Sequence, residues 1–378
     1  MPPLISLKQL WKVFGDQSEQ ALSDLQSGKD ADALHAETGI KAAVSDVSLS
    51  IEAGEIFVVM GLSGSGKSTL LRMINGLISP SAGEVVIEGK PLTGMSLAEI
   101  QRLRRSKMAM VFQSFALFPQ RTALENAAFG LEVAGVPQRQ RLDKARQALE
   151  RVGLGLELHN YPHQLSGGMQ QRVGLARALA LDPPILLMDE AFSALDPLIR
   201  REMQEQLLEL QAESSRTIVF ISHDLDEAVR LGDRIALMKS GKVLQCDSPS
   251  ELLSKPANEQ VRHFFRDVDA ASVLTVKTIA ETPDCVLRNS DGRQSLESAA
   301  AGKEAFVVDD QNLFIGVLRP NGEMITAQQG PVLTPETTIR EAINSVVSAP
   351  YPVPIVGADQ RLIGVISPRR LLGSMLLE

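Results

Sequence analysis

The sequence predicts an α/β protein with a parallel-sheet core and a small additional domain at its C-terminus. Three apolar runs, at residues 56–60, 185–188 and 217–221, have the length and composition of buried parallel strands, and polar residues follow each of them directly. A helix-rich stretch at about 117–181 separates the first two runs. Strands that alternate with helices and end in polar side chains are typical of a doubly wound fold.

The first predicted strand leads into a run with the spacing of a phosphate-binding loop, Gly61-Leu62-Ser63-Gly64-Ser65-Gly66-Lys67-Ser68-Thr69. Glycines let backbone N–H groups turn toward phosphate oxygens, and the helix expected after the loop adds the positive end of its dipole. Lys67 would reach the β- and γ-phosphates, and the Ser68 hydroxyl would ligate Mg²⁺. The run therefore predicts nucleotide binding. A flexible Gly/Ser linker is the alternative, and the flanking strand and helix argue against it.

Acidic, imidazole and amide side chains follow the other predicted strands. Asp189 would hold Mg²⁺ beside Ser68, and Glu190 would polarise the water that attacks the γ-phosphate. His223 is expected to contact the γ-phosphate. Gln113 would touch Mg²⁺ or the attacking water and transmit its position to the helices. Each of these residues is an ordinary solvated or core side chain in the alternative interpretation, and their shared place at strand ends favours catalysis.

Charge and composition exclude several classes of protein. The 378 residues carry a net charge of −8, so no basic field points to nucleic-acid binding. The two cysteines, Cys246 and Cys285, lie far apart and are expected to be reduced thiols of a cytosolic protein. The N-terminus lacks the layout of a signal peptide, and no apolar run approaches the roughly 18 residues that span a bilayer. A membrane role would therefore require partner subunits.

Two segments lie outside the predicted strand-and-helix core. Residues 15–40 form a strongly acidic insertion whose leucines would pack a short helix or two on the surface. Beyond 265–267 the sequence changes to short β-like segments, and residues 306–318 align with 354–366 as a weak internal repeat. Each copy is expected to form a strand, a turn and a second strand. The duplication predicts a small, separately folded C-terminal domain.

A second motif, rarer than the phosphate loop, is Leu165-Ser166-Gly167-Gly168 with Gln170-Gln171-Arg172 after it. With the phosphate loop, Gln113, Asp189-Glu190, Ser193-Ala194-Leu195-Asp196 and His223, it occurs in the order found in ATP-binding-cassette (ABC) ATPases, which the chain resembles. The resemblance implies a head-to-tail homodimer that sandwiches two ATP molecules.

Several further site residues follow from this resemblance. Ser166, Gly167 and Gly168 of one subunit would face the phosphate loop of the other, and Asp196 joins the nucleotide-binding set. The position of Phe14 matches the aromatic residue on which adenine stacks; a buried core side chain is the alternative there.

The resemblance narrows to one branch of the family, the ATP-binding subunits of bacterial osmoprotectant importers. The insertion after Phe14, the run 189–200, and 256–259 with Phe264-Phe265 look like that branch. It implies ATP hydrolysis that drives import of glycine betaine, proline betaine, choline or proline. The implied partners are transmembrane permease subunits and, through them, a periplasmic or lipoprotein substrate-binding protein, with no nucleic acid. The subunit would lie peripherally on the cytoplasmic face of the inner membrane.

The same branch carries paired cystathionine-β-synthase-type (CBS) modules, which the C-terminal repeat resembles. We therefore expect a phosphate-loop ABC ATPase domain at 1–266, with a helical subdomain at about 117–181, and a tandem CBS-like α+β regulatory domain at 270–378. Where nucleotide-binding CBS modules have an Asp that holds ribose, this chain has Gly322 and Arg370. Adenosine binding by the tail is therefore not expected. Arg369 and Arg370 would meet an anionic surface or remain simply solvated.

Two other functions compete with osmolyte import. The first is an importer ATPase for another solute, such as methionine or a different amino acid, and the insertion and the C-terminal modules argue against it. A soluble ABC ATPase of DNA repair or translation normally carries long coiled-coil insertions or two cassettes in one chain, and this sequence has one cassette and neither feature.

Overall fold

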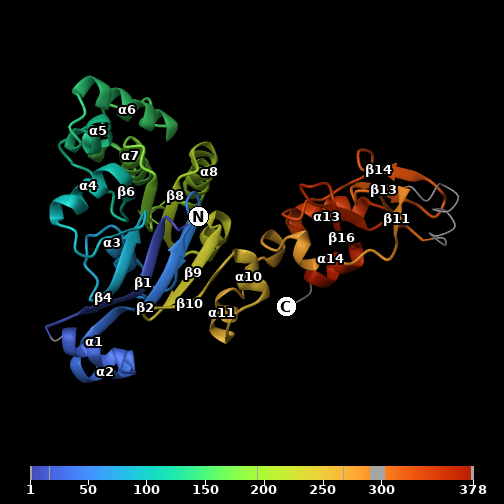
Figure 1. Cartoon of the computed structure of the whole chain (residues 1–378). Coiled ribbons are helices and arrows are strands. Elements are labelled where there is room, and N and C mark those ends of the chain that lie inside the picture. The colour runs from blue at the N-terminus through green and yellow to red at the C-terminus, as the bar shows by residue number, and fades with distance from the viewer. Residues whose placement is uncertain (1, 17, 194, 267, 290–302, 376–378) are drawn as a thin grey trace. The chain divides into compact units, whose positions relative to one another are not determined.

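The structure is a computed structural model that describes residues 2–16, 18–193, 195–266, 268–289 and 303–375 (Figure 1). Ala194 of the predicted motif, and 290–302 and 376–378 of the predicted C-terminal domain, lie outside the described residues. The chain divides into two compact units: Met1–Ser248 with Ala257–His263, and Pro249–Pro256 with Phe264–Glu378.

A six-stranded sheet forms the centre of the first unit. From one edge to the other its strands are β10 (Lys242–Asp247), β9 (Arg234–Lys239), β3 (Ile56–Met60), β8 (Thr217–Ser222), β7 (Ile185–Asp189) and β6 (Met108–Val111). All neighbours are parallel except β9 and β10. The three predicted strands, β3, β8 and β7, are adjacent, and every residue in them is buried. Their carboxyl ends therefore open on one edge of the sheet.

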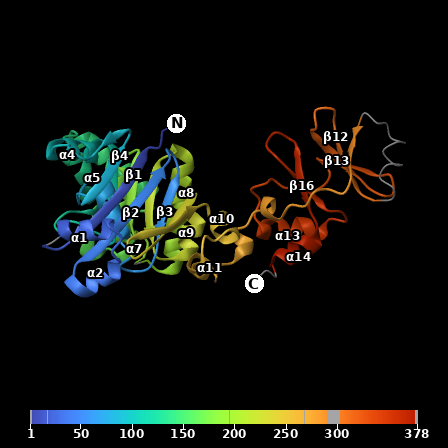
Figure 2. The same ribbon diagram turned by 60° about the horizontal axis from the view of Figure 1, so that its bottom comes forward.

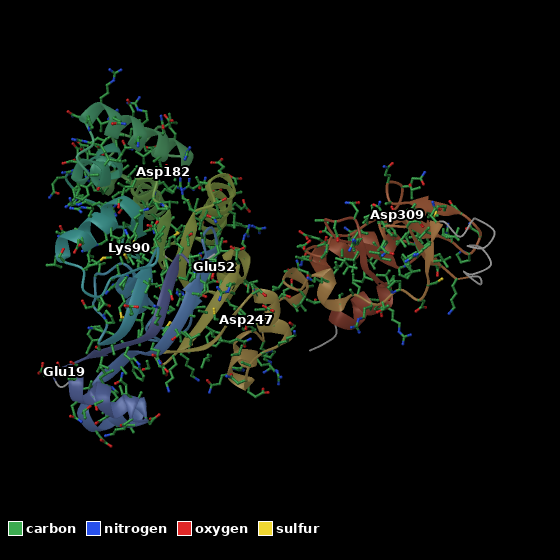
Figure 3. The ribbon with its side chains drawn as sticks, in the orientation of Figure 1. Glu19, Glu52, Lys90, Asp182, Asp247 and Asp309 are labelled. Atoms are coloured by element: carbon green, nitrogen blue, oxygen red, sulfur yellow. The ribbon has the colours of Figure 1, made fainter. Side chains whose placement is uncertain are left out.

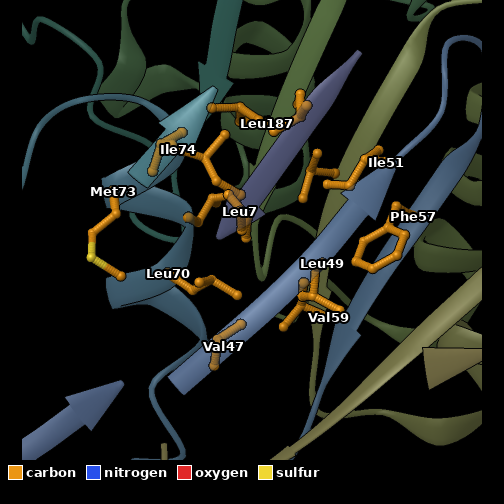
Figure 4. Packing of buried hydrophobic residues seen from close by; sticks show 14 of the residues in the cluster. Leu7, Val47, Leu49, Ile51, Phe57, Val59, Leu70, Met73, Ile74 and Leu187 are labelled. Atoms are coloured by element: carbon orange, nitrogen blue, oxygen red, sulfur yellow. The ribbon is translucent and has the colours of Figure 1, made fainter. Parts of the chain in front are cut away.

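A second, antiparallel sheet packs on the first unit's core. Its strands are β2 (Lys41–Ile51), β1 (Ile5–Phe14), β4 (Ala82–Ile87) and β5 (Lys90–Pro91). Apolar side chains of both sheets and of α3 (Lys67–Ile74) form one buried cluster, which includes Leu7, Leu49, Phe57, Leu70 and Leu187 (Figure 4). The cluster fixes α3, and with it the end of the phosphate loop, against both sheets.

The acidic insertion joins β1 to β2 as two short helices, α1 (Ser18–Gln26) and α2 (Ala31–Thr38). They lie together at the end of the β1–β2 pair in both ribbon views (Figures 1 and 2). Leu25 and Leu34 are buried in a small local cluster, whereas Glu19 lies on the exposed outside of α1 (Figure 3). The insertion therefore has an apolar core of its own.

Helices complete the first unit. The helix-rich stretch contains α5 (Ala123–Val133), α6 (Gln138–Arg151), the short 3₁₀ helix η1 (Pro162–Gln164) and α7 (Gly167–Leu179), and the three α-helices pack on one another. The sheet is further flanked by α4 (Leu97–Lys107), α8 (Pro197–Ser214) and α9 (Leu225–Leu231). Polar N-caps explain where several of these helices begin, because a side-chain oxygen accepts from a free first-turn amide. Ser166, Asp196 and Asp224 cap α7, α8 and α9 in this way.

The chain passes from the first unit to the second through α10 (Pro249–Ser254) and α11 (Glu259–Phe264). The second unit then contains the 3₁₀ helices η2 (Ala270–Ser272) and η3 (Val276–Ile279) and the helices α13 (Ile339–Ser348) and α14 (Pro368–Met375). Its sheets are β11 (Val286–Arg288), β12 (Ala305–Val308), β13 (Phe314–Leu318) and β14 (Met324–Thr326), and the pair β15 (Val353–Val356) and β16 (Leu362–Ile366).

The repeat appears as two antiparallel pairs, β12–β13 and β15–β16, in matching register. Val308 pairs with Phe314 in the first copy, as Val356 pairs with Leu362 in the second. A helix follows directly on β16, whereas β13 continues into a further strand, β14. Among the described residues, every helix of the chain falls short of the length and apolar character that a membrane crossing requires.

Candidate nucleotide-binding site

The phosphate loop lies between β3 and α3, and two of its glycines are required by close backbone contacts. At Gly66, where φ is +102°, an added Cβ would lie 2.0 Å from the carbonyl oxygen of Ala43 in β2. At Gly61, where φ is +153°, it would lie 2.1 Å from the carbonyl oxygen of Met238 in β9. Only glycine fits these positions, because any side chain would overlap the neighbouring strand.

The tip of the loop presents its backbone to solvent. Ser63 and Gly64 are exposed, Thr69 is half-buried in the first turn of α3, and Ser65 is buried. Within the described part of the chain, the Ser65 hydroxyl has no hydrogen-bond partner. The exposed tip leads directly into the N-terminus of α3, and backbone amides at such a place are of the kind that binds phosphate.

Lys67 lies under this surface and is only 4 % exposed. Its Nζ donates to the carbonyl oxygens of Gly61, at 2.7 Å, and Leu62, at 3.1 Å, and lies 3.9 Å from Oε1 of Glu190. Burial lowers the pKa of Lys67, and the nearby carboxylates of Glu190 and Asp189 oppose that effect. A buried ammonium group held in place by main-chain oxygens is suited to bind an anionic ligand at the loop.

Ser68 and Asp189 meet at the carboxyl end of β7. The Ser68 hydroxyl donates to Oδ1 of Asp189 at 2.8 Å, and the carboxyl group is buried, with 3 % exposure. Burial raises the pKa of Asp189, and the hydrogen bond from Ser68 partly opposes the rise. Adjacent hydroxyl and carboxylate oxygens fit Mg²⁺, a hard cation that proteins bind through one or two carboxylates together with substrate phosphates.

Glu190 is the point where the predicted catalytic residues come together. Its Oε2 accepts from Nε2 of Gln113 at 3.1 Å and lies 3.2 Å from Nδ1 of His223. The Glu190 backbone has a φ of +45°, in the left-handed region, and its N–H donates to the carbonyl oxygen of Ile221 in β8 at 3.2 Å. Within the described part of the chain, no hydrogen bond occupies Oε1, the other carboxylate oxygen.

The Ser166–Gly168 run and Asp196 form a separate group at the starts of α7 and α8. The Ser166 hydroxyl accepts from the Met169 N–H at 3.3 Å, and Asp196 accepts from the first amides of α8. A Cβ on Gly168 would lie 3.4 Å from the side chain of Ile199, so the two helix starts are neighbours. No hydrogen bond or ion pair between described residues links this group to Lys67 or Glu190 of the same chain.

Phe14 ends β1 and is 45 % exposed, which excludes the alternative of a buried core residue. The ammonium of Lys12 lies 5.1 Å from the centre of its ring. An exposed ring at a strand end is available for stacking on a planar ligand.

Residues that the sequence analysis did not single out support the loop that carries His223. The Ser222 hydroxyl donates to the buried carboxyl of Glu227, which also accepts from Nε2 of Gln204 at 3.1 Å. Burial raises the pKa of Glu227, although both hydrogen bonds oppose the rise. Arg200 donates to Asp224 at 3.0 Å and to the Leu195 carbonyl at 3.2 Å. In the sequence, Asp224 with Glu227 three positions later is the pattern of a helix start, and it could have indicated that α9 begins directly after His223.

Known proteins similar to this chain include members of one family. The model of the ABC transporter family matches residues 44–193. The glycine betaine/proline betaine transport system ATP-binding protein ProV of Escherichia coli is 47 % identical over 98 % of this chain and 97 % of its own length. The chain belongs to the ATP-binding subunits of ABC transporters.

Two further likenesses place this family member more closely. The glycine betaine transport ATP-binding protein OpuAA of Bacillus subtilis is 45 % identical over 99 % of this chain and 93 % of its own. The dimeric, post-hydrolysis structure of the ATP-binding cassette MJ0796, bound to ADP and Pi, matches with a TM-score of 0.55 and 34 % identity over 65 % of this chain and 98 % of that one. The predicted ABC ATPase fold and the resemblance to osmoprotectant importer subunits are thus confirmed, and the chain is a transport ATPase rather than a non-transport one.

We expect Asp189→Asn to raise the thermal stability of the nucleotide-free protein near neutral pH. The folded state must bury an ionised carboxylate, which its raised pKa shows to be unfavourable, whereas an amide of the same size still accepts from Ser68. Differential scanning calorimetry in Mg²⁺-free buffer measures the effect, with Asp143→Asn at an exposed position of α6 as the control.

The pH dependence of this gain has a definite sign. Because the folded-state pKa of Asp189 is raised, the wild-type carboxyl takes up its proton in the folded state first as pH falls. The advantage of Asn should therefore shrink toward zero as pH approaches 3.8, the ordinary value for Asp. A loss of stability, or a gain that is constant with pH, contradicts the prediction.

Proposed function

We propose that this chain hydrolyses ATP to drive import of glycine betaine or a related quaternary-ammonium or zwitterionic osmolyte, such as proline betaine, choline or proline. Hydrolysis is supported above all by the meeting of Gln113, Glu190 and His223 beside the phosphate loop. The class of substrate is supported by the transport systems to which the E. coli and B. subtilis relatives belong, since these relatives match nearly the whole chain.

The loop residues bind the nucleotide in this proposal. Backbone amides at the tip and the N-terminus of α3 receive the phosphates, Lys67 neutralises part of their charge, and Phe14 stacks on the adenine. Ser68 and Asp189 hold Mg²⁺, with Gln113 as a further oxygen ligand. Bound Mg²⁺ offsets the charge of the phosphate oxygens and keeps the phosphate chain aligned.

Glu190 is the proposed general base, and its two oxygens have different tasks. Oε2 is held by Gln113 and His223, which leaves Oε1 to accept a proton from the attacking water. The water oxygen then forms a bond to the γ-phosphorus, and the bond from that phosphorus to the bridging oxygen of ADP breaks. With Nδ1 turned to Glu190, the other ring nitrogen of His223 is available to contact the γ-phosphate.

We further propose that Ser166, Gly167, Gly168 and Asp196 serve the site of a second, head-to-tail copy. The Met169 amide is capped by Ser166, but among the described residues the amides of Gly167 and Gly168 have no partner and can bind an anion, since the first amides of a helix have none within the helix. Among the described residues they have no hydrogen bond or ion pair with Lys67 of the same chain, which supports a contribution across a dimer interface. Permease subunits on the membrane, and a substrate-binding protein beyond them, would place the dimer on the cytoplasmic face.

Glu190→Gln tests the base directly. The amide would keep an oxygen toward Gln113 and His223 but present an NH₂ group in place of Oε1, so it cannot take the proton from water. We expect ATP hydrolysis to fall at least about 100-fold while ATP affinity is retained. Near-normal hydrolysis in Glu190→Gln would contradict the role of Glu190 as general base.

Lys67→Ala should instead weaken ATP binding by roughly 10- to 100-fold, since a charge-assisted contact is lost.

The substrate is tested in proteoliposomes that contain this subunit with its permease and substrate-binding protein partners. ATP hydrolysis should be stimulated by glycine betaine, proline betaine, choline or proline and not by methionine. Stimulation by methionine alone would replace the proposed substrate with an amino acid. A binding protein with an aromatic cage would agree with a quaternary ammonium ligand.

The C-terminal unit is proposed to be regulatory, because every residue assigned to ATP binding or hydrolysis lies in the first unit. A chain that ends at residue 266 should still hydrolyse ATP and support transport in those proteoliposomes, but lose or shift its dependence on ionic strength. Loss of ATPase activity in a truncated chain that still folds, judged by circular dichroism, would contradict this division.

Calorimetric titration of full-length Lys67→Ala with AMP should show no high-affinity nucleotide site in the C-terminal unit, since Gly322 and Arg370 replace the ribose-binding Asp.

A further inference from the structure

A second lysine approaches the phosphate loop from outside. Lys41 is the first residue of β2 and pairs in register with Phe14, the last residue of β1. Its Nζ lies 3.6 Å from the position of a Cβ on Gly64, at the exposed tip of the loop. The contact of the Ala43 carbonyl with Gly66, two residues further along β2, fixes this end of the strand against the loop.

Among the residues that the structure describes, Lys41 differs from its neighbouring lysines in having no partner. Lys12 donates to the Ser79 carbonyl at 2.8 Å, and Lys29 in the insertion pairs with Glu37 at 2.6 Å. No hydrogen bond or ion pair engages the exposed Lys41 ammonium among the residues that the structure describes. A positive charge without a partner thus lies beside the backbone amides of the loop tip.

The buried lysine leaves room for such a second cation. Two of the three Lys67 ammonium hydrogens are directed to main-chain oxygens of the loop itself, Gly61 and Leu62, and it lies on the inner side of the loop. The phosphate chain of a nucleotide carries several negative charges and meets the loop tip on its exposed side. Charge on that side would come from Lys41.

We infer that Lys41 is a further nucleotide-binding residue, which contacts the phosphate chain of ATP from the solvent side of Gly64 while Lys67 contacts it from within. The inference rests on the proposed ATP-binding function of this loop. The acidic insertion connects Phe14 to Lys41. The Phe14 ring and the Lys41 ammonium group therefore lie at the same end of the β1–β2 pair.

The test measures the affinity of the full-length protein for MgATP by calorimetry in Lys41→Gln, with Lys8→Gln as the matched control. Lys8 is another exposed lysine of the same sheet, and it pairs with Glu84 at 3.2 Å. Lys41→Gln should raise the Kd about 3- to 10-fold at low ionic strength, Lys8→Gln should leave it unchanged, and Lys41→Arg should keep most of the affinity. Equal melting temperatures establish that the variants fold.

Salt separates a charge contact from a structural effect. An exposed contact is screened, so the ratio of the two Kd values should fall toward one between about 0.05 M and 0.5 M salt. A Kd for Lys41→Gln equal to that of wild type, or a ratio that does not change with salt, overturns the inference. If wild type itself binds no MgATP, or if Lys67→Ala, which should weaken binding roughly 10- to 100-fold, binds MgATP as tightly as wild type, the proposed function of the loop fails instead.

Discussion

The parallel pairing of β6, β7, β8 and β3 is the constraint on which the candidate site depends. Parallel neighbours end at the same edge of a sheet, so the segments after each strand emerge side by side. Gln113 and His223, which follow β6 and β8, both reach the carboxylate of Glu190, which follows β7. Lys67 follows the fourth strand, β3, and lies near the same carboxylate. The left-handed backbone of Glu190 costs roughly 1–3 kcal/mol by itself. The hydrogen bond from its N–H to Ile221 in the next strand helps to maintain it.

The same site works against the stability of the fold. Lys67 and Asp189 are both buried. Burial lowers the pKa of Lys67 and raises that of Asp189, so it favours the neutral form of each group. Ser68 and the main-chain oxygens around Lys67 offset part of that cost, but a ligand of opposite charge would offset more of it. Electrostatic binding is strong at such a place because the groups are already desolvated and held in position.

The insertion and the C-terminal unit lie outside this sheet edge, and each has an apolar core of its own. The insertion forms a small local core and returns the chain to β2 at Lys41, beside the loop. The C-terminal unit has apolar clusters of its own, built around two strand pairs in matching register. Both Arg369 and Arg370 are exposed in that unit, and the guanidinium of Arg370 also donates to the Ile279 carbonyl at 3.2 Å, which is a structural contact.

Local patterns were enough to predict much of this protein, because a phosphate loop, a strand that ends in Asp189-Glu190 and the Ser166–Gly168 run are contiguous in sequence and carry their chemistry in the spacing of their residues. The family and the α/β core could be predicted from them. Tertiary structure alone decided which oxygen of Glu190 accepts from Gln113, that Glu227 supports the loop of His223, and that Lys41 approaches Gly64. These relations join residues on different strands, and their distances depend on strand order and register, which no single segment encodes.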